Sequence, residues 1–195
     1  MHELRDEWSA TANQSVNKVM GDYLRSFKTI EVDSFKEDNL PPEAKDFLKS
    51  QKGLFKAVAA SIIAHTYNPE SSFSQRIKGF DYTLGPDIAK LAGIDQYDAL
   101  LFIAGQNYIW TSGRVAMALF AFAMQAATGI QVQIPAGPEW MIVALIDTRT
   151  GDIVWFNYIP MPGDLRNDEV NKRLAQALFK SFIQKWERVE EKKDE

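Results

Sequence analysis

The sequence predicts an α/β domain in which a mixed β-sheet is covered by helices on both faces. Two apolar runs, at 141–146 and 153–156, flank a polar turn that contains Gly151, which is the pattern of a β-hairpin near the C-terminal end. The first run does not alternate apolar with polar residues, so we expect both faces of that strand to be covered. Amphipathic helical patterns precede and follow the hairpin, as helices packed on a sheet require.

The first quarter of the chain predicts two helices joined by a short strand. Residues 6–27 read as a helix with one apolar stripe, and alternation at 29–33 reads as a strand. Pro41 and Pro42 open the second helix, in which Gly53 is a point of bending or splitting. The stripe of the first helix is Trp8, Ala12, Val16, Val19, Tyr23 and Phe27, and that of the second is Phe47, Leu54, Val58 and Ile62.

The middle of the chain predicts alternating strands and helices. After a loop at 68–72 we expect an edge strand at 76–83, and then a short helix at 86–92 that Gly93 ends. A buried strand follows at 99–104, where Gly105 turns the chain out of the sheet. The apolar segment 115–127 is shorter than the ~20 residues that cross a bilayer, so it predicts a buried core helix.

The chain after the hairpin predicts a long C-terminal amphipathic helix. A break at Pro160 to Gly163 separates the hairpin from this helix at 168–189. Its apolar stripe is Val170, Leu174, Leu178, Phe182, Trp186 and Val189. With no linker between these elements, residues 1–189 form a single domain, and residues 190–195 form a charged tail that we expect to be disordered.

Composition excludes several classes of function. The net charge of −4, with scattered Lys and Arg, argues against a nucleic-acid partner, which needs a basic face. The absence of cysteine excludes thiol catalysis and Cys-ligated metal sites. Only two histidines occur: His2 lies at the terminus, and His65 suits a structural role at the end of a helix better than catalysis. We therefore predict no enzymatic activity, no cofactor and no metal.

Four residues are candidates for contact with a partner or a ligand. Ser112 and Arg114 follow a buried strand and open a helix, where an anion could bind, although Ser112 alone is also a plain N-cap. No glycine-rich phosphate-binding motif occurs. Trp110 and Trp140 are expected in loops, either as partner anchors or packed on their own domain. Asp147 and Asp152 resemble half of a calcium loop but fit a simple turn better.

Three segments carry a resemblance to a known group of proteins: 97–103, 111–114 and 145–157. Asp98-Ala99 opens an apolar strand, and Asp147 begins an Asp-x-x-x-Gly-x-Ile-x-Trp hairpin. In these features the chain resembles bacterial envelope lipoproteins, the small α/β group similar to the TolB amino-terminal domain that includes auxiliary lipoproteins of ABC-type transport. The hairpin carries most of the likeness, and it is a structural motif rather than a catalytic one.

The resemblance implies a non-enzymatic domain on the periplasmic side of the cell envelope, lipid-anchored and bound to other envelope proteins of a transport or assembly system. Anchoring needs a lipidated cysteine, and this sequence has none, so the cysteine would have to precede Met1. The alternatives are a cytoplasmic location and an α/β domain that binds a small anion near Ser112 and Arg114. The first and last helices could also form a surface for homo-oligomers.

Overall fold

The computed structural model describes residues 6–27, 30–35, 37–67, 80–91, 93–107, 139–160 and 163–191, with the side chains of 181 and 183–191 excepted. The chain order of its main elements is α1 (Asp6–Arg25), α2 (Pro42–Ile62), β1 (Ala99–Gln106), β2 (Trp140–Asp147), β3 (Ile153–Pro160) and α5 (Asp168–Glu191). The shorter helices are η1 (Glu37–Asn39), the π-helical η2 (Ile63–Tyr67) and η3 (Pro86–Lys90).

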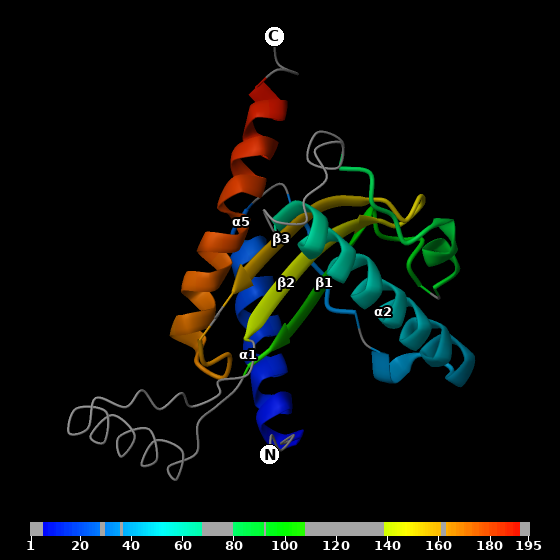
Figure 1. The fold of residues 1–195 in the computed structure, drawn as a ribbon, viewed down its shortest axis with the longest axis horizontal. Helices are drawn as coiled ribbons and strands as arrows, with labels where there is room; N and C mark the ends of the chain where they lie inside the picture. Colours follow the sequence, from blue (N-terminus) through cyan, green and yellow to red (C-terminus); the bar gives the residue numbers. More distant parts are fainter. Residues whose placement is uncertain are drawn as a thin grey trace, which may run out of the picture.

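These elements form three layers. The strands pair in the order β1-β2-β3, and both pairings between them are antiparallel. Helices α1 and α5 lie side by side on one face of the sheet, and α2 covers the other face (Figure 1). The predicted α/β class, with helices on both faces and a long helix after the hairpin, is confirmed. A parallel pairing, which the expected mixed sheet would contain, does not occur among the described strands.

Strand β2 is the centre of the molecule because its two faces belong to two different cores. Met141 and Val143 pack into the core beneath α1 and α5. Ile142, Ala144 and Ile146 pack into the core beneath α2. All five side chains are at most 2% exposed. Burial on both faces explains the run without alternation.

The hairpin turn is held by its own side chains. Asp147 Oδ1 accepts the backbone N–H groups of Arg149 at 2.8 Å and Thr150 at 3.0 Å. These bonds, with Thr150 first, lower the pKa of the Asp147 carboxyl. Gly151 takes a positive φ of 77°, which an L side chain rarely adopts. The structure therefore confirms the turn interpretation of Asp147.

Neighbouring segments cover parts of both sheet edges. The backbone of Tyr82 and Leu84 bonds to Ile153 and Gly151 at the start of β3. On the β1 side, Val32 packs against the core beneath α1 and α5, whereas Phe35 packs with Leu100 in a small third cluster. The connection between α1 and α2 thus passes around β1. Such covering prevents pairing of exposed strand edges with other chains.

Two predicted strands are wrong where the structure describes them. Residues 30–33 are not in a strand. The Val32 carbonyl accepts a hydrogen bond from Arg25 Nε at 3.3 Å instead of pairing with a neighbouring strand. In the predicted strand 76–83, residues 80–82 form no ladder, and Thr83 makes one isolated bridge with Asp152. Residues 76–79 lie outside the described part, as do the predicted loop 68–72 and the predicted helix 115–127.

Four local expectations are also corrected. The buried face of α2 carries Leu48, Phe55 and Ile62; of the predicted stripe, Ile62 lies on this face, whereas Leu54 is 42% exposed. Gly53 does not interrupt α2. Gly105 stays in β1 opposite Met141, and a Cβ there would lie 3.3 Å from the Trp140 carbonyl oxygen. Helix α5 continues to Glu191, so the expected disordered tail begins as helix.

Candidate functional site

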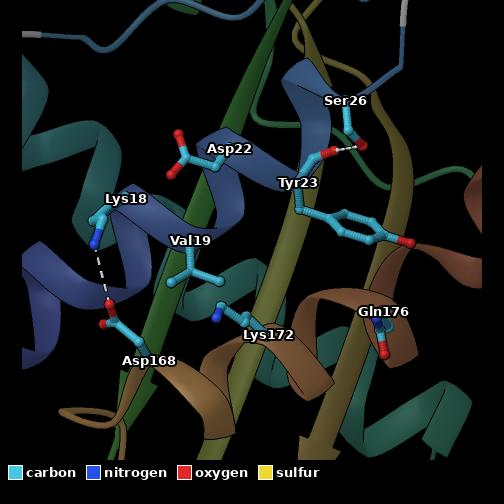
Figure 2. Close-up of a pocket in the computed structure, with 8 residues that line it drawn as sticks. All are labelled: Lys18, Val19, Asp22, Tyr23, Ser26, Asp168, Lys172 and Gln176. Carbon is cyan, nitrogen blue, oxygen red and sulfur yellow. Dashed lines mark hydrogen bonds and ion pairs between the residues drawn. The ribbon is translucent and has the colours of Figure 1, made fainter.

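A shallow groove of about 410 Å³ lies between α1 and α5, on the side turned away from the sheet (Figure 2). Five of the eight residues that line it come from α1 or its C-terminal end, and three come from α5. They are Lys18, Val19, Asp22, Tyr23, Ser26, Asp168, Lys172 and Gln176. The four charged side chains and Val19 lie toward one end of the groove, and Tyr23, Ser26 and Gln176 lie toward the other (Figure 2).

The two helices are held side by side by apolar packing and by a polar network. Ser15 Oγ donates to Asp168 Oδ1, and Asn171 Nδ2 donates to Ser15 Oγ at 2.8 Å. The same Asn171 amide donates to the Leu165 carbonyl at 2.8 Å. Asn171 is fully buried, so these bonds offset the cost of removing its amide nitrogen from water. The network sets Ser15 level with the first turn of α5.

Farther along, Tyr23 of α1 stacks on Phe179 of α5, with ring centroids 6.0 Å apart. The two helices therefore run in the same direction along the sheet. Trp155 of β3 also stacks on Phe179, with ring centroids 5.4 Å apart. This aromatic contact, together with the network at Ser15, fixes how far one helix is shifted along the other.

Four charged side chains form a crossed square in the groove. On α1, Lys18 is followed one turn later by Asp22, and on α5, Asp168 is followed one turn later by Lys172 (Figure 2). Positive and negative groups therefore alternate both along each helix and across the groove. We call these four residues the charge square. Their side chains are 63%, 62%, 44% and 58% exposed in that order, so they are available to a partner.

Neighbours hold the charges of the square in place. Lys18 Nζ lies 3.1 Å from Asp168 Oδ2 across the groove. The Ser15 hydroxyl, followed by Lys18, lowers the pKa of the Asp168 carboxyl. The hydrogen bond to Glu169, at 2.6 Å, raises the pKa of the Lys172 amine. Asp168 and Lys172 are thus both charged at neutral pH.

Ser15 and Lys18 have the Ser-x-x-Lys spacing of some nucleophilic enzymes, but their geometry does not suit that chemistry. A Ser–Lys pair needs an exposed hydroxyl and an amine free to take its proton. Here Ser15 is 7% exposed and donates to Asp168, and the Lys18 amine is paired with the same carboxylate. The arrangement positions charge rather than activating a nucleophile.

Of the four predicted site residues, Trp140 alone lies in the described part of the chain. Trp110, Ser112 and Arg114 lie outside the described residues, and their roles stay predictions. Trp140 is the first residue of β2 rather than a loop residue, and its Nε1 donates to Gln106 Oε1 at 3.2 Å. Its ring packs against the core beneath α2. His65 lies in η2 directly after α2, at a helix end as expected.

The described residues contain neither a cluster that could bind a metal ion nor a helix that could cross a membrane. No group of three or more His, Asp or Glu side chains among them could hold a metal ion. Both oxygens of Asp147 face groups of its own turn, with Arg149 3.8 Å from Oδ2. In the part of the chain that the structure describes, no helix combines the length and apolar character needed to cross a bilayer.

Comparison with known proteins found no family model, no curated protein and no solved structure that matches the chain. The class that fold and groove define is a three-layer α/β domain with a charged groove between two parallel helices. This groove was not among the sites predicted from the sequence. A usable signal existed, because opposite charges four residues apart occur on the polar faces of both flanking helices.

Proposed function

We propose that this chain is a non-enzymatic protein-binding domain that faces the periplasm and serves an envelope transport or assembly system as an accessory component. The native protein would be lipid-anchored through a cysteine that precedes Met1. The resemblance of the hairpin and of Asp98-Ala99 to envelope lipoproteins supports the location. The charge square supports binding.

The charge square is the observation that carries the binding proposal. Four exposed charges of alternating sign, fixed by packed helices, form a pattern that a complementary protein surface can read. The groove between them is shallow and open, whereas sites for small molecules are usually concave and bury most of the ligand. Of the hydroxyl groups that line it, Ser26 Oγ is committed to the Tyr23 carbonyl at 2.6 Å. Recognition of a protein is therefore the function that this geometry supports best.

Site-specific photo-crosslinking in cells tests the binding proposal. A photoreactive amino acid replaces Gln176, which lines the groove, or Lys56, which is exposed on α2 on the opposite side of the sheet. We expect a discrete crosslinked protein from position 176 and none from position 56. Mass spectrometry then identifies the partner. No crosslink at position 176, or the same products from both positions, would reject the groove as a protein-binding site.

Two measurements test the location. Protease added to cells with a permeabilised outer membrane should digest the protein while a cytoplasmic marker stays intact. Labelled palmitate should enter the native protein, and replacing the cysteine that carries it should release the protein from membranes. Protection from protease together with the cytoplasmic marker would contradict the periplasmic placement and favour the cytoplasmic alternative.

A further inference from the structure

We propose that the groove between α1 and α5 binds a second copy of this chain in a two-fold symmetric dimer, with α1 of each copy lying over α5 of the other. The inference rests on the proposed function, because it takes the groove to be a protein-binding site and names the occupant. The charge square carries it.

The charge square is complementary to itself. Lys18 lies 3.1 Å from Asp168 across the groove. Because α1 and α5 run in the same direction, the residues one turn later on each helix, Asp22 and Lys172, also lie at the same height (Figure 2). A two-fold axis parallel to the helices places α1 of the second copy over α5 of the first. This rotation keeps every residue at the same height along the axis. It therefore sets each Lys18 against Asp168 of the second copy. The same rotation sets each Asp22 against Lys172 of the second copy.

The dimer needs no change in the fold. All four side chains are exposed and lie on two helices that the Ser15–Asn171 contact and the Tyr23–Phe179 stack already fix. Exposed ion pairs contribute little singly and are screened by salt. The dimer should therefore be weak and should dissociate as salt rises. This salt dependence distinguishes it from an apolar interface.

A charge swap tests the dimer. Asp22→Lys places a lysine against Lys172 of the second copy, and Lys172→Glu places a glutamate against Asp22. Asp22 is paired with Arg25 and Lys172 with Glu169, each on the exposed surface of its own helix, so we expect both variants to fold, which circular dichroism verifies. In a mixture of the two variants, every facing pair has opposite charges again. Lys56→Glu on α2 is the matched control.

Sedimentation equilibrium over a range of protein concentrations gives the result. At low salt we expect wild type and Lys56→Glu to associate equally, and each groove variant alone to associate at least about tenfold more weakly, as like charges across an interface require. The mixture should recover wild-type association. A monomeric wild type, a mixture that fails to recover, or an equal loss in Lys56→Glu would overturn the dimer.

The two proposals can fail separately. A crosslink from position 176 to a different protein, with purified wild type monomeric at every concentration, would refute the dimer and leave the groove as a binding site for that protein. No crosslink from position 176 to any protein would refute the binding function itself.

Discussion

At the scale of single residues, Asn171 is the buried polar group on which the contact between α1 and α5 depends. Its amide satisfies both the Ser15 hydroxyl and the Leu165 carbonyl. Asn171→Ala should lower the free energy of unfolding by about 1–3 kcal/mol, because buried acceptors lose their donor. Urea denaturation measures the change. Gln176→Ala, at an exposed position on the same helix, should stay within about 0.5 kcal/mol of wild type.

Asp168 makes the stability of the same contact depend on pH. The Ser15 hydroxyl and then Lys18 hold its pKa below the ordinary value of 3.8 in the folded chain. The contribution of the Asp168 carboxylate to the free energy of unfolding is therefore complete above pH 3.8, and it is lost as the pH falls through the lower pKa of the folded state. We expect Asp168→Asn to melt below wild type at neutral pH, and the difference to shrink in acid.

Thermal unfolding of both proteins from neutral pH down to about pH 3 tests this expectation. Asp147 and Asp164 also have lowered pKa values, but they titrate in both proteins and cancel in the difference. A difference in melting temperature that stays constant in acid would show that the Asp168 carboxylate does not stabilise the fold through its charge.

At the scale of elements, two glycines have opposite roles. Gly151 has a φ of 77°, and a Cβ there would lie 1.9 Å from the Gly85 carbonyl oxygen. Gly53 lies within α2 with no atom within 4 Å of a Cβ. Gly151→Ala should destabilise the protein by at least about 2 kcal/mol through strain and overlap. Gly53→Ala should stabilise it by about 0.5–1 kcal/mol.

Denaturation midpoints of the two alanine variants, measured side by side, test this contrast. The pair is informative because the same methyl group is added in both cases and only the backbone context differs. A tolerated alanine at 151 would mean that the turn can retreat from Gly85. A destabilising alanine at 53 would mean that α2 is packed on its exposed side.

At the scale of the whole molecule, β2 joins the two cores into one cooperative unit. Met141 packs under α1 and α5, and the next residue, Ile142, packs under α2. Met141→Ala and Ile142→Ala should each cost about 2–5 kcal/mol, because each leaves a cavity in a closed core. Both substitutions should lower the midpoint of one unfolding transition, and circular dichroism and tryptophan fluorescence should report the same midpoint. Separate transitions for the two helical layers would contradict a shared core.

Sequence periodicity alone was sufficient for elements whose pattern is local and repeated. The helix at Asp6–Arg25, the helix opened by Pro42 and the long helix from Asp168 follow from their stripes. The hairpin followed from two apolar runs around Gly151. Covering on both faces followed from the missing alternation in β2. In each case the pattern that determines the element lies within the residues of that element.

Only the tertiary structure decided the features that depend on distant residues. Val32 and Tyr82 have strand-like neighbours, yet Val32 packs on the core beneath α1 and α5 and Tyr82 bonds to Ile153, so alternation misplaced both segments. The groove lies between helices that are about 150 residues apart in the chain, as the separation of Lys18 from Asp168 shows. A sequence displays which charges stand one turn apart on a helix. The sequence does not indicate which other helix lies beside that helix, because the packing of both helices on β2 determines their pairing.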